Sequence, residues 1–268
     1  MTPAFDHGGD LTLALELADL ADAITMSHFR SRSLVTETKP DLTEVTLADR
    51  GAETAIVEAL RSARPEHAVL GEEHGVSGPP DAAFRWIIDP IDGTGNYVRH
   101  VPIWATLIAL QDVMTGHVEV GVVSAPALRR RWWARRGGGA FADGQPIAVS
   151  RVARIEDAFV SWSDGHWPVT VHSSKRAGWQ RVAERAHRQR CIGDFWQHVL
   201  VAEGAIDIAC EPIVSLWDLA ALVPIVEEAG GRFSDLDGGI GPAGGSALSS
   251  NSLLHDEVLA ALVGERDQ

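Results

Sequence analysis

Apolar residues recur at helical spacing near the N-terminus of the chain. Four of them fall every three or four positions after Asp10: Leu13, Leu17, Leu20 and Ile24. This spacing predicts an amphipathic helix with Asp10 as its N-cap. A second helix is predicted over residues 52–64, and Pro65 ends it.

The pattern then changes to short apolar or alternating runs bounded by Gly, Pro and Asp. Runs of this kind are typical of β-strands. We expect four strands, over residues 68–73, 85–90, 103–112 and 117–126. Residues 141–150 predict a hairpin that turns at Asp143-Gly144.

Helices and strands alternate after about residue 150. The predicted strands cover residues 159–163, 205–211 and 232–236, and the predicted helices cover residues 175–188, 195–204, 215–231 and 253–265. We therefore expect an N-terminal half (1–150) with helices and a large antiparallel sheet, and a C-terminal α/β half (151–268). The chain has no Pro/Ser-rich linker near residue 150, so tight packing of the two halves is expected.

Composition and charge narrow the class of protein. The 268 residues are 45% hydrophobic and carry a net charge of −14, which repels nucleic acid and anionic membranes. The two cysteines cannot cross-link a chain of this length, and the 11 histidines lack zinc-site spacing. The N-terminus lacks a basic segment before an apolar run, and no apolar stretch approaches the roughly 20 residues of a membrane span. These features predict a soluble cytoplasmic protein.

Acidic residues stand at the ends of several predicted elements. They are Asp49, Glu72, Glu73, Asp89, Asp92 and Asp218. Each has a purely structural explanation. Asp49 and Asp218 fall in the first turns of helices, where an acid favours the positive end of the helix dipole. The two acids of 89–92 would suit a turn around Pro90 and Gly93, and the two glutamates would suit a solvated loop.

The apolar neighbours of these acids favour a different explanation. Asp89 follows Trp86, Ile87 and Ile88, and Asp218 lies between Trp217 and Leu219. An uncompensated buried carboxylate costs several kcal/mol, so a group of them needs a shared cation. Oxygen ligands without Cys or His indicate Mg²⁺ or Mn²⁺. A carboxylate-held Mg²⁺ with open positions is suited to phosphoryl transfer to water.

The segment 93–96, Gly-Thr-Gly-Asn, adds candidates for the phosphate and the attacking water. The backbone amides of Gly93 and Thr94 would bind phosphate oxygens at a helix N-terminus, and glycine allows close approach. The Thr94 hydroxyl would orient the attacking water, with Asp49 as proton acceptor.

Four motifs together resemble the inositol monophosphatase family of Mg²⁺-dependent, lithium-sensitive phosphomonoesterases. They are VTLAD (45–49), GEE (71–73), WIIDPIDGTGNY (86–97) and WDLAALVPIVEEAGG (217–231). The order agrees with that family, and the resemblance covers nearly the whole chain. It implies an α/β fold of the inositol monophosphatase and fructose bisphosphatase type, a five-layered αβαβα sandwich.

The resemblance also implies a metal-ligand set. Glu72 and Asp89 with the Ile91 carbonyl would hold one metal ion. Asp89, Asp92 and Asp218 would hold a second, and Glu72 would contribute to a third, weaker site. Two or three Mg²⁺ ions are thus implied, with Mn²⁺ as an alternative.

The same resemblance implies the catalytic residues. Asp49, Thr94 and Glu72 are the candidates, and the amides of Gly93 and Thr94 would take the phosphate. Lys39 falls on a loop that carries a basic residue near the site in this family.

Longer segments resemble the histidinol-phosphate phosphatase branch of the family. They are residues 98–110, 129–144, 194–212 and 214–238. Asp194 and Glu211 add two acids on the leaving-group side, which favours a cationic alcohol over a neutral polyol. Histidinol phosphate is therefore the expected substrate, and an inositol-1-monophosphatase or a broad-specificity phosphatase is the alternative.

Asp194 and Trp196 each have two possible roles. Asp194 itself would alternatively cap the helix over 195–204. Gln197 and Trp196 are candidates to contact the imidazole of the substrate, although Trp196 would equally suit the core.

A function of another class rests on residues 128–139, where five arginines surround two tryptophans. Such a segment would bind single-stranded nucleic acid. The alternative is an amphipathic strand, which the net charge of −14 and the intact set of acids favour. The segment is also a candidate homodimer interface.

Overall fold

The computed structural model describes residues 7–31, 36–38, 44–163 and 173–263. The helices are α1 (His7–His28), α2 (Leu47–Ala63), α3 (Thr94–Val98), α4 (Ser173–Arg185), α5 (Asp194–Ala202), α6 (Leu216–Ala220), α7 (Leu222–Glu228) and α8 (His255–Val263). Short 3-10 turns lie at Ile155–Asp157 and Pro242–Gly244.

The strands form a small hairpin and two larger sheets. The hairpin joins β1 (Thr36–Thr38) and β2 (Glu44–Thr46). The first large sheet contains β3 (Ala68–Gly71), β4 (Gly75–Ser77), β5 (Phe84–Asp92), β6 (Ala105–Asp112), β7 (Val118–Ala125), β8 (Arg130–Arg135), β9 (Ala140–Ala142) and β10 (Gln145–Pro146). The second contains β11 (Phe159–Trp162), β12 (Arg188–Cys191), β13 (Ile208–Glu211), β14 (Arg232–Ser234) and β15 (Ala247–Ser250).

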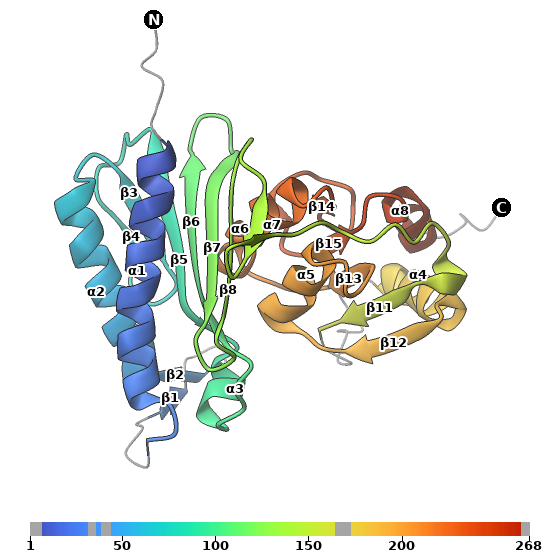
Figure 1. Cartoon of the computed structure of the whole chain (residues 1–268), viewed down its shortest axis with the longest axis horizontal. Helices are drawn as coiled ribbons and strands as arrows, with labels where there is room; N and C mark the ends of the chain where they lie inside the picture. The colour runs from blue at the N-terminus through green and yellow to red at the C-terminus, as the bar shows by residue number, and fades with distance from the viewer. Residues whose placement is uncertain (1–6, 32–35, 39–43, 164–172, 264–268) are drawn as a thin grey trace, which may run out of the picture.

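The elements stack in five layers (Figure 1). Helices α1 and α2 cover one face of the eight-stranded sheet, whose order is β10-β9-β8-β7-β6-β5-β3-β4. Helices α5, α6 and α7 lie between this sheet and the five-stranded sheet, whose order is β12-β11-β13-β15-β14. Helices α4 and α8 cover the outer face of the second sheet. The expected αβαβα sandwich is confirmed.

Successive side chains of β5 point into two different apolar cores, which explains its continuous apolar run. Trp86 and Ile88 belong to the core beneath α1 and α2, whereas Ile87 belongs to the core beneath α5–α7. Successive side chains of a strand point to opposite faces, so a strand between two helical layers is apolar on both. The face toward α5–α7 is closely packed: a Cβ on Gly121 of β7 would lie 2.2 Å from the Ala221 carbonyl oxygen.

Several local predictions need correction. Helix α1 begins at His7, so Asp10 lies in its first turn rather than at its N-cap and pairs with Arg64 at 2.9 Å. The predicted helix over 215–231 is two helices, α6 and α7, that meet at Ala221. The hairpin at Asp143-Gly144 is confirmed, because Ala142 pairs with Gln145.

The division of the chain near residue 150 stays a prediction, although the strands of the first sheet end at Pro146 and those of the second begin at Phe159. Among the residues that the structure describes, no helix is both long enough and apolar enough to span a membrane.

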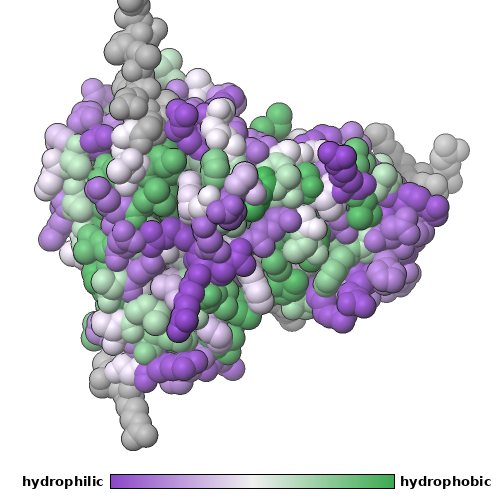
Figure 2. All heavy atoms as spheres, in the orientation of Figure 1, coloured by the Kyte–Doolittle hydropathy of each residue, from purple (hydrophilic) through white to green (hydrophobic). Residues whose placement is uncertain are grey.

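The arginine–tryptophan segment forms β8 and the turns beside it. Trp132 is fully buried, and its indole N–H donates to Glu203 at 2.5 Å. Arg130 pairs with Asp143 and Glu203, and Arg131 pairs with Asp19 and Asp22, both at 2.7 Å. Figure 2 shows hydrophilic side chains gathered over β7, β8 and α1 on this face. These pairs support the amphipathic strand, because acids of the same chain neutralise the charges of Arg130 and Arg131.

Candidate active site

The two aspartates of β5 point to the same side because the strand carries a bulge. Asp89 pairs with Leu107 of β6 and Asp92 pairs with Ala105, so three steps along β5 match two along β6. Without the extra residue, side chains three positions apart would point to opposite faces. Pro90 lies in the bulge, where its missing N–H costs no ladder bond, and its carbonyl accepts from the Thr106 hydroxyl at 2.8 Å.

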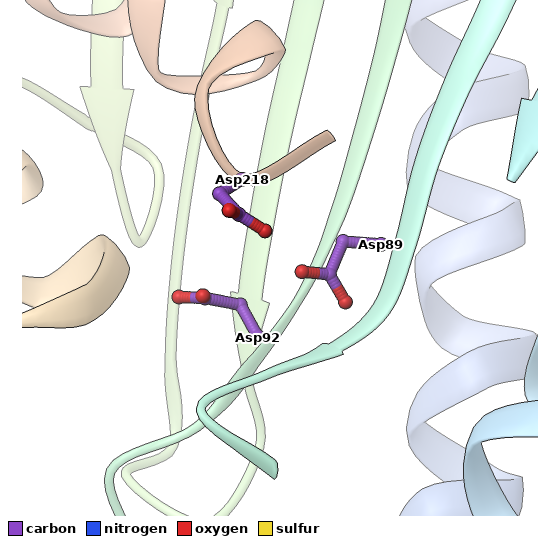
Figure 3. Close-up of side chains that lie close together, drawn as sticks. All are labelled: Asp89, Asp92 and Asp218. Carbon is purple, nitrogen blue, oxygen red and sulfur yellow. The ribbon is translucent and has the colours of Figure 1, made fainter. Parts of the chain in front are cut away.

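A third aspartate reaches this bulge from the middle helical layer. Asp218 lies in the first turn of α6, where its Oδ2 accepts from the Ser215 N–H at 2.7 Å. Oxygen atoms of Asp89, Asp92 and Asp218 lie within 4.8 Å of one another. Figure 3 shows the three carboxylates converging, two from β5 and one from α6. The helix-turn role foreseen for Asp218 and its metal-ligand role are therefore compatible.

Burial and mutual repulsion disfavour ionisation of all three acids. Burial, followed by the charges of Glu72 and Asp92, raises the pKa of Asp89 well above its ordinary value. Burial, followed by the charges of Asp194 and Asp218, does the same to the pKa of Asp92. Burial raises the pKa of Asp218 to about 7, although the Ser215 N–H opposes the shift. A cation between the three carboxylates would remove this repulsion.

Glu72 directly follows the neighbouring strand β3 and lies at the level of Asp89. Gly71, the last residue of β3, pairs with Ile88 of β5 in a parallel ladder, so Glu72 follows at the level of Asp89. Its own N–H donates to the Ile88 carbonyl at 3.1 Å. After burial, the charge of Glu72 is the largest cause of the raised pKa of Asp89, so the two acids interact electrostatically.

Asp49 lies in the first turn of α2 and is fully buried. Its Oδ2 accepts from the Thr46 N–H at 2.8 Å and from the Thr46 hydroxyl at 2.6 Å, which completes a capping box. Its Oδ1 lies 3.4 Å from the Thr94 hydroxyl, which also donates to the Ile91 carbonyl at 2.9 Å. Burial raises the pKa of Asp49 to about 6. One oxygen of the carboxylate is thus used in the helix cap, and the other faces the Thr94 hydroxyl.

Gly93 is the N-cap of α3, and its φ of 81° is in the left-handed region. A Cβ at this position would lie 3.1 Å from the Ile103 carbonyl and 3.3 Å from a carboxylate oxygen of Asp194. Glycine is therefore required for both conformation and space. The N–H groups that follow a helix N-cap have no partner inside the helix, so they are available to an anion.

A pocket of about 300 Å³ opens beside the aspartates on the side of the second sheet. Its lining consists of Asp92, Ser163, Asp194, Phe195, Glu211, Ile213, Val214 and Asp218. The Phe195 N–H donates to Asp92 at 2.7 Å, which ties α5 to the end of β5. The structure thus brings the predicted leaving-group residues Asp194 and Glu211 next to two of the predicted metal ligands.

Asp194 does not cap α5 through its side chain. The N-cap is Gly193, and the Asp194 carboxylate accepts instead from the Asn96 amide at 3.0 Å. Asp194 itself has a φ of 50°. Burial and the charge of Glu211 raise its pKa to about 6. The capping alternative is therefore wrong, and Asp194 instead links α5 to the segment after Gly93.

Three other candidates fall outside the pocket lining or outside the described residues. Gln197 is fully buried and accepts from the Ser161 hydroxyl at 2.9 Å, so the structure does not bring it to the pocket surface. Trp196 is half-buried and packs against the core between the sheets. Lys39 lies outside the described residues.

The donors fit a hard divalent cation. Carboxylates are ligands that Mg²⁺ and Mn²⁺ prefer, and here three of them gather where burial, followed by the charges of neighbouring acids, raises the pKa of each. The residue types, the geometry and the electrostatics at the end of β5 are those that a metal site requires.

Comparison with known proteins decides the family. The model of the inositol monophosphatase family matches residues 10–267. The chain belongs to the inositol monophosphatase family. It is 52% identical to a histidinol-phosphatase of Mycobacterium tuberculosis, over 94% of this chain and 97% of the relative. It is 48% identical to a histidinol-phosphatase of Streptomyces coelicolor, over 96% of this chain and 98% of the relative.

Solved structures of inositol monophosphatase type share the fold. The extragenic suppressor protein suhB of Bartonella henselae superimposes with a TM-score of 0.87 at 27% identity, over 97% of this chain and all of that one. An IMPase of Thermotoga maritima superimposes with a TM-score of 0.82 at 31% identity, over 95% and 97% of the two chains.

Two buried residues of this inositol monophosphatase family member support the site and were not foreseen. Glu53 of α2 accepts from the N–H groups of Glu73 and His74, both at 2.8 Å, and so fixes the turn after Glu72. His198 of α5 bonds to Glu211 at 3.0 Å. Glu53 had a signal in the sequence: it falls on the apolar face of its helix, next to Ala52 and three residues before Ile56.

Proposed function

We propose that this phosphatase of the inositol monophosphatase family hydrolyses histidinol phosphate to histidinol and inorganic phosphate, with Mg²⁺ as its metal. The observation that carries the choice of substrate is the pair Asp194 and Glu211, which lines the pocket beside Asp92 and Asp218. The two histidinol-phosphatases, 52% and 48% identical over nearly their full lengths, support the same choice.

Electrostatics at the pocket favour a cationic leaving group. Asp194 is mostly buried, and the neighbouring charge of Glu211 adds to burial in raising its pKa to about 6. An ammonium group placed between these acids would relieve their repulsion and hold both ionised. A neutral polyol would leave the repulsion in place. The pocket should therefore bind an amino alcohol phosphate more tightly than an inositol phosphate.

The metal would be held where the carboxylates converge. Glu72, Asp89 and the Ile91 carbonyl are the proposed ligands of one ion, and Asp92 and Asp218 complete the ligands of a second together with Asp89. A third ion near Glu72, and Mn²⁺ in place of Mg²⁺, belong to the same proposal. When bound, these ions neutralise the phosphate oxygens and make a bound water more acidic.

The chain's own residues then orient the attack. Thr94 would direct a lone pair of the attacking water toward phosphorus, and Asp49 would receive the proton. A pKa of about 6 leaves Asp49 largely ionised at neutral pH, as a proton acceptor requires. The Gly93 and Thr94 amides would hold the phosphate oxygens, while Asp194 and Glu211 bind the departing alcohol.

The experiment that tests this function is release of phosphate in Mg²⁺ buffer from histidinol phosphate and from inositol 1-phosphate. We expect kcat/KM at least about tenfold higher for histidinol phosphate, which corresponds to about 1.4 kcal/mol of discrimination. Asp194→Ser should reduce that ratio, and Asp81→Ser, at an exposed turn position, should leave it unchanged. Equal rates on both esters would indicate a broad-specificity phosphatase instead.

Assembly and location complete the proposal. We propose a cytoplasmic homodimer, with the segment 128–139 at its interface. Half-buried Trp133, which stacks on Phe141 at a centroid distance of 6.0 Å, offers an aromatic contact surface there. Sedimentation of the wild type and of Trp133→Ser tests the interface: a monomeric wild type would contradict it.

A further inference from the structure

The carboxylate of Glu211 bonds to the buried imidazole of His198. Glu211 ends β13, is 5% exposed and lines the pocket. Its Oε2 lies 3.0 Å from Nε2 of His198, which is fully buried. The same acid thus faces the pocket on one side and a fixed nitrogen on the other.

The imidazole is fixed at its second nitrogen as well. Nδ1 of His198 lies 2.8 Å from the Ser249 hydroxyl, and the ring packs against Phe233 at a centroid distance of 5.6 Å. Ser249 pairs with Ala209 in the ladder between β13 and β15, two residues before Glu211. Because side chains two apart on a strand share a face, Glu211 and Ser249 both point toward α5.

The hydrogen-bond partners of His198 determine which of its ring nitrogens carries the proton. An ionised carboxylate only accepts hydrogen bonds, so Nε2 of His198 carries the proton that binds Glu211. In the neutral ring Nδ1 then accepts, and the Ser249 hydroxyl is its donor. All three groups are satisfied in this arrangement, which is the condition for burying them together.

His198 lies on the same helix as Asp194, the other acid of the pocket. His198 follows Asp194 by four residues on α5, and residues at i and i+4 lie on one face of a helix. One turn of α5 therefore carries an acid that lines the pocket and a base that orients the other acid of the pocket.

We propose that His198 is a positioning residue that determines specificity: it holds the Glu211 carboxylate toward the ammonium group of a cationic leaving alcohol. This inference rests on the proposed function for the identity of the leaving group. It assigns His198 no contact with substrate or metal. Its effect should appear in the binding of cationic esters and not in the chemical step.

The test compares His198→Leu and His198→Gln with the wild type on histidinol phosphate and inositol 1-phosphate. His198→Leu should raise KM for histidinol phosphate about tenfold, change kcat less than about threefold, and change KM for inositol 1-phosphate less than about threefold. His198→Gln can place an amide donor near Oε2 and should recover much of the loss. Equal KM increases for both esters, or a loss in kcat alone, would overturn the proposal.

A double-mutant cycle with Glu211→Gln separates positioning from general loss of structure. In the Glu211→Gln background, His198→Leu should add less than about twofold to KM, since each change removes the same interaction. Additive effects would contradict the proposal. If His198→Leu does not fold, the ¹⁵N signals of the wild type and of Glu211→Gln give the decision.

A spectroscopic measurement does not depend on the substrate. The ¹⁵N signals of His198, assigned by their loss in His198→Gln, should show protonation at Nε2 in the wild type and should shift in Glu211→Gln. A ring protonated at Nδ1 alone would overturn the proposal. If the wild type shows no preference for histidinol phosphate, the proposed function fails, while the tautomer and the cycle still report on His198 itself.

Discussion

Replacing Asp218 by asparagine should stabilise the metal-free protein while it removes activity. The carboxylate of Asp218 is close to Asp89 and Asp92, and burial raises its pKa to about 7 from 3.8. An asparagine at this position retains a carbonyl oxygen for the Ser215 N–H but carries no charge. The substitution therefore removes one negative charge, and with it the repulsion from Asp218, and it also removes one candidate metal ligand.

The sign and size of the effect follow from proton linkage. Between pH 3.8 and about 7 the unfolded chain ionises Asp218 while the folded chain keeps its proton, so the stability of the wild type falls as pH rises. Each unit of pKa difference corresponds to about 1.4 kcal/mol. The advantage of Asp218→Asn over the wild type should therefore grow by about 2–3 kcal/mol between pH 5 and pH 8.

Urea unfolding in EDTA at both pH values measures this difference directly. Asp81→Asn, at an exposed turn, is the matched control and should show no such change with pH. In Mg²⁺ the order should reverse, because the metal stabilises the wild type, and the activity of Asp218→Asn should fall below about 1%. A wild type that remains the more stable protein in EDTA at pH 8 would refute the electrostatic account of the site.

Three further predictions follow from other contacts. Thr94→Val removes the hydroxyl between Ile91 and Asp49 and should lower kcat by about a hundredfold with little change in KM; an unchanged kcat contradicts its role. Glu53→Gln should lower the unfolding free energy by about 2 kcal/mol and raise the Mg²⁺ concentration for half activity, whereas exposed Glu58→Gln on the same helix should do neither. Burial, followed by the charge of Arg232, lowers the pKa of His255 to about 4, so stability should fall by about 3 kcal/mol as pH drops from 6.5 to 4, and a slope that persists in His255→Gln excludes this source.

Most helices and the apolar strands were predictable because their signal is local. The run from Trp86 to Ile88 and the two acids after it predict a buried strand that ends in a site. The polar strand β12 was not predictable, since its four residues are exposed and carry no apolar pattern. β15 is buried but reads Ala-Leu-Ser-Ser, so its position comes from pairing with β13 and β14 rather than from its own residues.

The residue types of the site were predictable, but their orientation was not. Two aspartates three residues apart indicate a site only if a bulge turns them to one face, and the sequence gives Pro90 as the sole hint of it. The roles of Asp194 and Gln197 depend on which side of α5 faces the pocket. That choice follows from long-range contacts, such as the hydrogen bond from Phe195 to Asp92, which no local pattern contains.

The same hydrogen bond links the helix of Asp194 to the metal-ligand candidate Asp92, and would couple substrate choice to metal binding in the proposed function. The Phe195 N–H belongs to the first turn of α5, the helix that also carries Asp194 and His198, and it binds an oxygen of the metal-ligand candidate Asp92. Asn96, three residues after Gly93, binds Asp194 from the opposite direction. A shift of α5 would therefore move Asp194, His198 and the metal-ligand candidate Asp92 together. It follows that substitutions in the pocket that displace this helix should change the requirement for Mg²⁺ as well as the substrate preference.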